Sequence, residues 1–324
     1  MTVVYSTHHL HPDATELLAR TGLRVASALD AATLIRESRD AAVIIVRAPL
    51  PPDIFAGAHR IRAAIRHGAG LDMIPVDAAT EAGVLVANVP AVNARSVAEH
   101  VIFACLALLR RFRMMDRDLR RDGWLAGREH ANLNHELAGR TIGIVGMGAV
   151  GREIASIARH GFGLTVLGNS RRNHGFPDFV QAESIDDLIA DSDIVVLACP
   201  LSPETTGLMD RRRLAAMRPG SILVNVSRGP VVDEPALVDS LREGRLLGAA
   251  LDVFATQPLP PDHPLFSFDN VLITPHMAGI TEESMMRMGV GAAEETLRVL
   301  ANRLPVNLRN PGVVGRYRKR FPET

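Results

Sequence analysis

Residues 142–151, Ile-Gly-Ile-Val-Gly-Met-Gly-Ala-Val-Gly, constrain the fold of this chain more than any other stretch. The apolar run Thr141 to Val145 predicts a buried strand, and the apolar spacing from Arg152 to His160 predicts a helix. Three glycines between them have the spacing G-x-G-x-x-G, which suits a tight turn that brings the backbone close to a pyrophosphate. The start of the helix adds free amides and the positive end of its dipole. The sequence therefore predicts that a dinucleotide is bound by Gly146, Gly148, Ala149, Val150 and Gly151.

The overall charge and hydropathy exclude several classes of partner. Lys plus Arg and Asp plus Glu each number 36, so the chain has no general attraction to nucleic acid or to an anionic membrane. The longest apolar stretch, Val101 to Leu109, is too short to cross a bilayer, and Met1 to Tyr5 has no signal-peptide pattern. Cys105 and Cys199 lie far apart in apolar runs, which predicts buried, reduced thiols in a cytoplasmic protein rather than a disulfide or a metal site.

The basic residues near the end of the chain also limit the chemistry. Lys319 is the single lysine, so neither Schiff-base catalysis nor the phosphate-binding lysine of a P-loop NTPase is expected. The run Arg316 to Arg320 around it is expected to be a solvated end rather than an arm that binds nucleic acid.

Strand and helix patterns alternate along the chain. Short apolar runs predict strands at residues 2–6, 41–46, 61–66, 84–87, 141–145, 164–167, 194–197, 222–226, 247–251 and 271–274. Helices are predicted between them at residues 11–20, 75–81, 152–160, 185–190, 212–217 and 235–242, and at the end at 282–301. A capping-box pattern, Ser96 to Glu99, predicts the start of a long apolar helix through Leu109, and a basic helix is expected at residues 114–124. This alternation predicts an α/β fold of parallel sheets with helices on both faces.

The end of the second strand after the glycines bears on the choice of cofactor. In the NAD form of this fold, an acidic residue about 20 positions past the glycines bonds the ribose hydroxyls. Ser170, 19 residues after Gly151, occupies that position, and Arg171 and Arg172 follow it. No carboxylate at this position repels a 2′-phosphate, and two guanidinium groups could pair with one. NADP(H) is therefore expected to be preferred, with NAD(H) as the alternative.

Three segments at predicted strand ends carry residues suited to catalysis, and ligands of open α/β sheets bind at such ends. They are Asn225-Val-Ser-Arg-Gly229, Leu251-Asp-Val-Phe-Ala-Thr-Gln-Pro258 and Thr274-Pro-His-Met-Ala-Gly279. A fixed guanidinium can stabilise negative charge on a carbonyl oxygen during hydride transfer, and an imidazolium can deliver a proton. Arg228 and His276 are therefore candidate catalytic residues, and a structural ion pair and a loop histidine are the alternatives.

With these segments the chain resembles the D-isomer-specific 2-hydroxyacid dehydrogenases, which include glyoxylate/hydroxypyruvate reductases, phosphoglycerate dehydrogenases and formate dehydrogenase. The resemblance covers nearly the whole chain. Besides the glycine motif it rests on Gly68-Ala-Gly70, Ser96-Val-Ala-Glu-His100, Cys199-Pro-Leu-Ser-Pro-Glu-Thr205, Ser227-Arg-Gly229 and Thr274-Pro-His276. It implies two doubly wound parallel-sheet domains, one Rossmann-like and one flavodoxin-like. Residues 1–98 with 283–324 would form the substrate domain, and residues 99–282 the NAD(P)-binding domain.

The resemblance also implies roles for single residues. Arg228 would hold the substrate carboxylate and carbonyl, His276 would exchange the proton, and the amides of Ala69 and Gly70 would receive the carboxylate. Asp252 would lie near the nicotinamide. Further cofactor contacts would come from Cys199, Pro200, Thr205, Val226, Ser227, His276 and Ala278. A homodimer would form through residues 101–137.

One position departs from the family pattern. The usual partner of the histidine is a glutamate followed by proline, whereas this chain has Gln257-Pro258, and formate dehydrogenase also has glutamine there. An amide oxygen can accept the ring N–H but adds no charge, so His276 is expected to titrate near the unperturbed value of about 6.5. We therefore expect a keto-acid reductase whose activity falls as the pH rises above about 6.5 to 7. Formate oxidation is the less favoured interpretation of Gln257.

Two alternative functions remain open from the sequence. The first is an NAD-dependent enzyme like phosphoglycerate dehydrogenase, for which Arg60, Arg62 and Arg66 could bind a substrate phosphate. The second, of another class, is a cofactor-sensing protein like the co-repressors that resemble this family. Arg47, at the end of a predicted strand, is expected to select the substrate in either enzyme.

Other side chains give weaker signals. The cluster His8, His9 and His11 could suggest a metal site, but a loop is the favoured interpretation because no other ligand cluster supports metal. His130 and His135 are expected on a polar connection, and Trp124 at a subunit interface.

Overall fold

The computed structural model describes residues 3–19, 24–27, 38, 40–57, 60–171 and 175–322. The chain divides into two compact units, Met1–Asn93 with Thr281–Thr324 and Ala94–Ile280. Each unit contains one sheet and its own buried apolar clusters. Among the described residues, no helix combines the length and the apolar character needed to span a bilayer.

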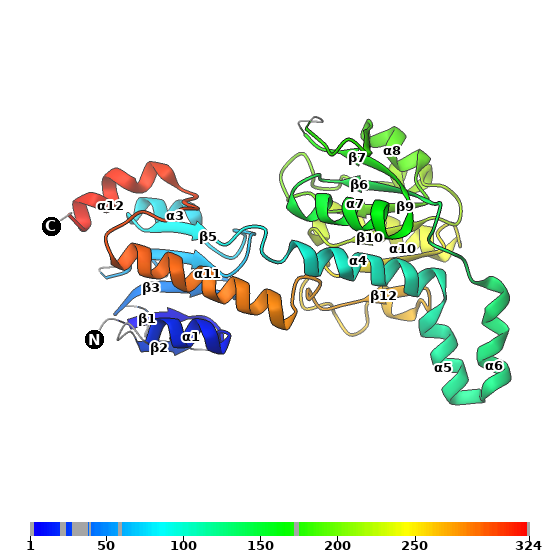
Figure 1. The fold of residues 1–324 in the computed structure, drawn as a ribbon, viewed down its shortest axis with the longest axis horizontal. Helices are drawn as coiled ribbons and strands as arrows, with labels where there is room; N and C mark the ends of the chain where they lie inside the picture. Colours follow the sequence, from blue (N-terminus) through cyan, green and yellow to red (C-terminus); the bar gives the residue numbers. More distant parts are fainter. Residues whose placement is uncertain are drawn as a thin grey trace. The chain divides into compact units, whose positions relative to one another are not determined.

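The first unit is a five-stranded parallel sheet in the order β2-β1-β3-β4-β5. Its strands are β1 (Val3–Ser6), β2 (Arg24–Ser27), β3 (Ala41–Val46), β4 (Ala63–Arg66) and β5 (Leu85–Asn88). Its helices are α1 (Pro12–Ala19), α3 (Val76–Glu81), α11 (Glu282–Leu300), the short η4 (Pro311–Val313) and α12 (Val314–Arg320). α1 and α11 share one buried cluster with the sheet, and α3 belongs to another (Figure 1). This strand order is the flavodoxin-like one.

The basic end of the chain is folded into a helix, although Arg316, Arg318 and Lys319 are exposed to solvent as expected. Residues 314–320 form α12, in which Tyr317 is buried at 5% exposure. Arg316 donates to the carbonyl of Thr80 at 3.3 Å, and Arg320 donates to the carbonyl of Ala82. Both carbonyls lie at the C-terminus of α3, where carbonyl groups lack partners within the helix and a positive charge is favourable. The arginines therefore attach α12 to α3.

The second unit is a seven-stranded parallel sheet in the order β12-β11-β10-β9-β6-β7-β8. The strands are β6 (Thr141–Val145), β7 (Thr165–Asn169), β8 (Val180–Ala182), β9 (Ile194–Leu197), β10 (Ile222–Asn225), β11 (Gly248–Leu251) and β12 (Val271–Ile273). The helices are α4 (Ala94–Leu109), α5 (Phe112–Asp122), α6 (Trp124–Glu129), α7 (Ala149–Phe162), α8 (Ile185–Asp191), α9 (Arg211–Ala216) and α10 (Glu234–Arg242). Three short turns, η1 (His130–Leu133), η2 (Gly229–Val231) and η3 (Pro264–Ser267), complete it.

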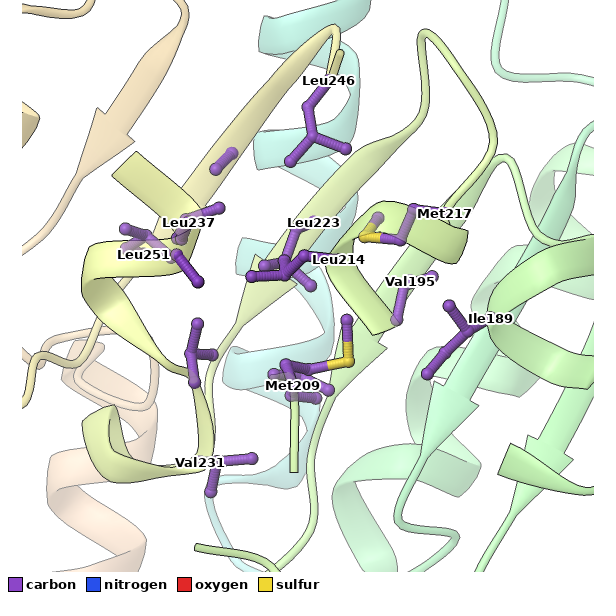
Figure 2. Packing of buried hydrophobic residues seen from close by; sticks show 14 of the residues in the cluster. Ile189, Val195, Met209, Leu214, Met217, Leu223, Val231, Leu237, Leu246 and Leu251 are labelled. Carbon is purple, nitrogen blue, oxygen red and sulfur yellow. The ribbon is translucent and has the colours of Figure 1, made fainter. Parts of the chain in front are cut away.

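The two faces of this sheet are covered by different helices. On one face, strand residues such as Val195, Leu223 and Leu251 pack against α8, α9 and α10, where Leu214 and Leu237 are buried (Figure 2). On the other face, α4 and α7 cover the sheet. Continuous apolar strands buried on both sides are typical of parallel sheets. The predicted α/β class with two doubly wound sheets is therefore confirmed.

Several elements differ in their limits from the expected ones. The edge strands β2 and β8 were not expected from the sequence, and the basic stretch forms two helices, α5 and α6, that lie side by side (Figure 1). The break falls at Gly123, whose φ is +90°. α4 begins at Ala94, so Ser96 lies inside the helix, and Glu99 pairs with Arg95 at 2.7 Å instead of completing a capping box.

Candidate active site

The turn from β6 to α7 leaves room for a ligand at the helix start. Gly146 has a φ of +105°, and a Cβ there would lie 2.5 Å from the amide nitrogen of Cys199. A Cβ on Gly151 would lie 2.1 Å from the carbonyl oxygen of Gly146. Around Gly148, the N-cap of α7, a Cβ would meet nothing within 4 Å. The first amides of a helix have no partner within it, so these residues fit a dinucleotide pyrophosphate. The amides concerned belong to Ala149, Val150 and Gly151.

The strand order changes direction beside this turn. β6 has β9 on one side and β7 on the other, and the chain continues outward from each. Ligands of open α/β sheets bind at such a point. The loop after β9 is fixed there, because Thr205 Oγ1 accepts from the Ser202 amide and donates to the Pro200 carbonyl, both at 2.8 Å. Cys199, which begins this loop, is buried.

The end of β7 places two of the three predicted cofactor-selecting residues. Ser170 follows the last strand residue, and Arg171 is exposed, whereas Arg172 lies outside the described residues. A carboxylate that the sequence argument did not consider lies within electrostatic reach, that of Glu204 on the loop after β9. A hydrogen bond from the Ser202 side chain, a backbone hydrogen bond and the charge of Arg171 together lower the pKa of Glu204.

Arg228 lies on a loop that is fixed by its neighbours. Asn225 Oδ1 accepts from the amide of Ser227 at 3.0 Å and from its hydroxyl at 2.7 Å, and Asn225 Nδ2 donates to the Arg228 carbonyl at 3.1 Å. A Cβ on Gly229 would lie 1.9 Å from the carbonyl carbon of Phe254, so this loop and the loop after β11 are in direct contact. Arg228 is half-buried and its guanidinium donates to the Ser227 carbonyl at 2.7 Å.

The carboxylate of Asp252 shapes the turn that carries His276. Asp252 Oδ1 accepts from the Thr274 hydroxyl at 2.6 Å and from the Met277 amide at 2.8 Å, and Oδ2 accepts from the Ala278 amide at 3.0 Å. The Asp252 carbonyl accepts from the His276 amide at 2.8 Å. His276 itself has a φ of +54°, a conformation that is rare outside glycine and is held by these bonds.

The side chains of His276 and Gln257 meet. Gln257 Oε1 lies 3.2 Å from His276 Nδ1, so the amide oxygen accepts from the ring when Nδ1 carries the hydrogen. His276 is half-buried and Gln257 is exposed. The strands that lead to Arg228, Gln257 and His276 are the neighbours β10, β11 and β12. The structure thus brings the three predicted catalytic residues to one edge of one sheet.

In the first unit, the loop after β4 is held by side chains that bind its carbonyls. Asn88 Nδ2 donates to the Ala69 carbonyl at 2.6 Å, and Arg66 Nε donates to the Gly70 carbonyl at 3.1 Å. Arg66 Nη1 also donates to the carbonyl of Val46, at 2.9 Å. These bonds fix the carbonyls of the two predicted substrate-binding residues, Ala69 and Gly70.

Comparison with known proteins agrees with this geometry. Residues 102–278 match the family model for the NAD-binding domain of D-isomer specific 2-hydroxyacid dehydrogenases. A glyoxylate reductase of Aeropyrum pernix is 36% identical over 324 aligned positions, with 96% of each chain covered. A D-3-phosphoglycerate dehydrogenase of Methanocaldococcus jannaschii is 34% identical over 96% of this chain, which spans 60% of that protein. A crystal structure of a Thermus thermophilus protein superimposes with a TM-score of 0.87 at 34% identity, covering 95% of this chain and 99% of that one.

The chain belongs to the D-isomer-specific 2-hydroxyacid dehydrogenase family. It is therefore an oxidoreductase that acts on a CH–OH group with a nicotinamide cofactor, and the glycine turn of the second unit fits that cofactor. Small keto or hydroxy acids are the substrates of such enzymes. The predicted family and enzyme class are thus confirmed.

Arg47 and His67 of this dehydrogenase lie at the ends of β3 and β4. Burial lowers the pKa of Arg47, whose guanidinium donates to the carbonyl of His9 and lies 3.8 Å from Met285 Sδ. His67 is 3% exposed, and its Nε2 has no hydrogen-bond partner among the described residues. Burial, then the charges of Arg47 and Arg66, lower the pKa of His67 to about 3. A buried neutral imidazole therefore lies directly before the loop of Ala69 and Gly70.

Two of the other histidines have carboxylate partners in this dehydrogenase. His11 Nε2 lies 3.0 Å from Glu282 Oε1, and His130 Nε2 lies 2.9 Å from Asp118 Oδ2. In the part of the chain that the structure describes, no cluster of three metal-ligating side chains occurs. Trp124 is 71% exposed.

Sequence reasoning missed the residues that position the catalytic ones. Asn225 and Thr274 were quoted only as parts of their segments, and Glu234 was not singled out. The side chains of Thr274 and Glu234 reach a neighbouring loop, and no spacing within one segment reveals such a contact. Asn225 instead bonds residues two and three positions further along its own segment. The signal available was indirect, since a polar residue at the end of an apolar strand often hydrogen-bonds the loop that follows.

Proposed function

We propose that this dehydrogenase reduces small 2-keto acids such as glyoxylate and hydroxypyruvate to D-2-hydroxy acids, with NADPH as the preferred cofactor. The observation that carries the proposal is the His276 ring, which meets Gln257 at the sheet edge that also carries Arg228 and the glycine turn. A guanidinium, an imidazole and a dinucleotide-binding turn are the groups that this reaction needs.

Arg228 binds the substrate in this proposal. When bound, the nicotinamide supplies the hydride that reduces the keto carbon. Arg228 pairs with the carboxylate and the keto oxygen of the substrate, and its charge stabilises the negative charge that develops on that oxygen. Asn225 supports the role because its side chain fixes the backbone on both sides of the arginine.

His276 is the proton donor in the same proposal. Since Nδ1 faces the amide oxygen of Gln257, Nδ1 carries a hydrogen and Nε2 exchanges the proton with the substrate. The imidazolium acts in reduction and the neutral ring acts in the reverse direction. A neutral amide adds no charge that favours the imidazolium, which costs reduction about tenfold or less at neutral pH.

The loop after β4 contributes substrate contacts in this proposal. The amides of Ala69 and Gly70 bind the substrate carboxylate, and the contacts that Asn88 and Arg66 make with the carbonyls of this loop support that role. Arg47 selects the substrate, supported by its place at the end of β3 beside Met285.

The NADPH preference rests on the end of β7. Ser170 puts no charge at the position that is acidic in NAD-selective relatives of this fold, and Arg171 offers a guanidinium to a 2′-phosphate. Glu204 opposes this preference, because its carboxylate interacts with Arg171 and repels a phosphate. We propose that the attraction between Arg171 and the 2′-phosphate outweighs the repulsion by Glu204.

The contacts of three arginines disfavour the alternative of a phosphoglycerate dehydrogenase. Arg66 donates to three backbone carbonyls, and Arg62 donates to Asn302 and stacks on Phe321. Arg60 Nε lies 4.0 Å from Asp40. The side chains that could have bound a substrate phosphate are therefore engaged within the first unit.

We also propose a homodimer that forms through residues 101–137. The support is a set of exposed large apolar side chains on α4, α5 and α6: Phe103, Phe112, Leu119, Trp124 and Leu125. Large apolar side chains exposed on neighbouring helices are typical of protein interfaces. A cytoplasmic location is proposed with it, since Cys105 and Cys199 are both buried free thiols.

A panel of 2-keto acids assayed with NADPH and with NADH, followed by nicotinamide absorbance, tests the proposed function. We expect turnover of glyoxylate and hydroxypyruvate and a higher kcat/KM with NADPH. Turnover of phosphohydroxypyruvate alone would favour the phosphoglycerate dehydrogenase alternative, and reduction of NAD or NADP by formate would favour formate oxidation. Tight cofactor binding without any turnover would favour a cofactor sensor.

A further inference from the structure

We propose that Glu234 is a positioning residue that holds the Gln257 loop, residues 255–263, and thereby sets the contact between Gln257 and His276. The inference rests on the proposed function, in which that contact orients the proton donor. Glu234 is the first residue of α10 and lies outside the segments that carry the catalytic residues.

The carboxylate of Glu234 contacts both ends of the Gln257 loop. Its Oε2 accepts from the Ala255 amide at 3.2 Å, and its Oε1 lies 3.0 Å from His263 Nε2. The side chains of Glu234 and His263 are 15% and 18% exposed, so the pair is largely shielded from water. One carboxylate therefore joins the first and last residues of the loop.

The tautomer of His263 follows from its second contact. His263 Nδ1 accepts from the Leu265 amide at 3.3 Å, so Nδ1 carries no hydrogen and Nε2 does. Nε2 then donates to Glu234 in the neutral form of the ring. Each oxygen of the carboxylate thus accepts one hydrogen bond.

The helix that carries Glu234, α10, is anchored in the core. Asp233 caps α10 by accepting from the Ala236 amide at 3.1 Å. Leu237 of the same helix is buried in the core (Figure 2), and Leu241 is buried as well. The contact of Gly229 with Phe254 fixes the backbone directly before the loop. Glu234 thus links the exposed Gln257 loop to a helix that is anchored in the core.

The loop has few other attachments. Residues 255–258 are exposed, and Leu259 is the residue of the loop that packs against the apolar core. Among the described residues, the hydrogen bonds of residues 256–262 are one within the loop, from the His263 amide to the Pro260 carbonyl, and one to the rest of the protein, between Gln257 and His276. That bond is already 3.2 Å long, so a small displacement of the loop breaks it.

Loss of the Glu234 carboxylate is expected to lower kcat through Gln257. In Glu234→Ala we expect kcat for keto-acid reduction to fall about tenfold, because misplacing a catalytic contact by a fraction of an ångström has effects of this order. KM for the cofactor should stay within about twofold, because the glycine turn is untouched. In a Gln257→Met background the same change should lower kcat less than about twofold, since the contact it supports is already absent.

A matched control lies on the same helix. Asp239 pairs with Arg211 at 2.6 Å on the exposed side of α10, and Asp239→Asn should leave kcat unchanged in both backgrounds. His263→Ala removes one of the two loop contacts and should give a smaller loss than Glu234→Ala, again only when Gln257 is present. Equal losses for Glu234→Ala with and without Gln257 would overturn the proposal, because the glutamate would then act independently of that residue.

A second measurement does not depend on turnover. Hydrogen exchange of the peptide that spans residues 254–264 should speed up in Glu234→Ala and in His263→Ala, but not in Asp239→Asn. If the exchange rate of this peptide is unchanged in Glu234→Ala, Glu234 does not hold the loop, and the proposal is overturned whatever the kinetics show. If the wild-type protein turns over no keto acid while exchange responds as expected, the proposed function fails. The attachment of the Gln257 loop by Glu234 is then still supported.

Discussion

At the scale of single residues, Asp252 is a positioning group for the turn that carries His276. Both of its oxygens accept hydrogen bonds from the turn that begins at Thr274, so the buried charge is compensated by three donors. These bonds hold the backbone of His276 in its left-handed conformation. Asp252 also raises the pKa of His100 on α4, an effect that is outweighed by burial, which lowers it.

Gln257→Glu is expected to move the pH profile of the reductase upward. A carboxylate 3.2 Å from the ring favours the imidazolium and raises the pKa of His276, so the protonated donor persists to higher pH. Relative to the wild-type enzyme, we expect the alkaline limb of Gln257→Glu to lie at least about one pH unit higher. The measurement is kcat against pH at saturating keto acid and cofactor.

Gln257→Met serves as the control for this prediction. It removes the acceptor without adding charge, so kcat should fall while the limb moves little. A profile of Gln257→Glu that coincides with that of the wild-type enzyme would contradict the coupling between the two side chains.

Arg171 and Glu204 are expected to act in opposite directions on cofactor choice. Arg171→Ala should raise KM for NADPH by about tenfold and leave KM for NADH nearly unchanged, because a charge-assisted contact with a phosphate is lost. Glu204→Gln should raise kcat/KM for NADPH by about two- to threefold, since an exposed charge has a modest effect. Arg211→Ala, an exposed arginine of α9, is the control. Equal effects on both cofactors would contradict the assignment.

At the scale of elements, apolar periodicity predicted most strands and helices, because buried parallel strands are continuous Val, Ile, Leu and Ala runs. The misses have physical causes. β8 is three residues at the sheet edge, Val-Gln-Ala, of which only the first is buried. α12 was hidden by its arginines, whose partners are carbonyls of a distant helix. The break between α5 and α6 depends on one glycine with positive φ, at position 123.

Part of the candidate site could be predicted from the sequence, and part could not. Gly146, Arg228, Gln257 and His276 follow from motifs at strand ends, because the fold itself places strand ends together. The contacts made by Glu234 and Thr274 could not be predicted, since they depend on how loops from different strands meet.

The helices α5 and α6 give a prediction about assembly. Trp124 and Leu125 are 71% and 77% exposed, and covering such side chains stabilises an interface. The double change Trp124→Glu with Leu125→Glu should convert a dimer, of twice 35.0 kDa, into a monomer in light scattering. Val306, 69% exposed in the first unit, offers the control Val306→Asp. A wild-type monomer, or a dimer that survives the double change, would contradict the interface.

At the scale of the whole molecule, two sheets of parallel strands place the candidate residues at strand ends, where backbone polar groups are not used by the sheet. This arrangement has a consequence for stability. At the end of β4, the His67 imidazole is buried with two arginines near it and is held neutral, since its pKa is lowered to about 3. In the unfolded chain the same ring takes up a proton near its ordinary value of 6.5.

The free energy of unfolding is therefore expected to decrease as the pH is lowered, because of His67. Between pH 6.5 and pH 3 the unfolded state binds a proton that the folded state does not, so the contribution of His67 is complete above pH 6.5 and is lost as the pH falls. At pH 5 the loss is about 2 kcal/mol relative to pH 8. His67→Asn removes the titrating group, so its Tm should fall less than that of the wild-type protein, by about 4 °C, between pH 8 and pH 5. His160→Asn, at an exposed site, should keep the wild-type dependence in scanning calorimetry. Parallel curves of Tm against pH for wild type and His67→Asn would show that this ring is not held neutral by the fold.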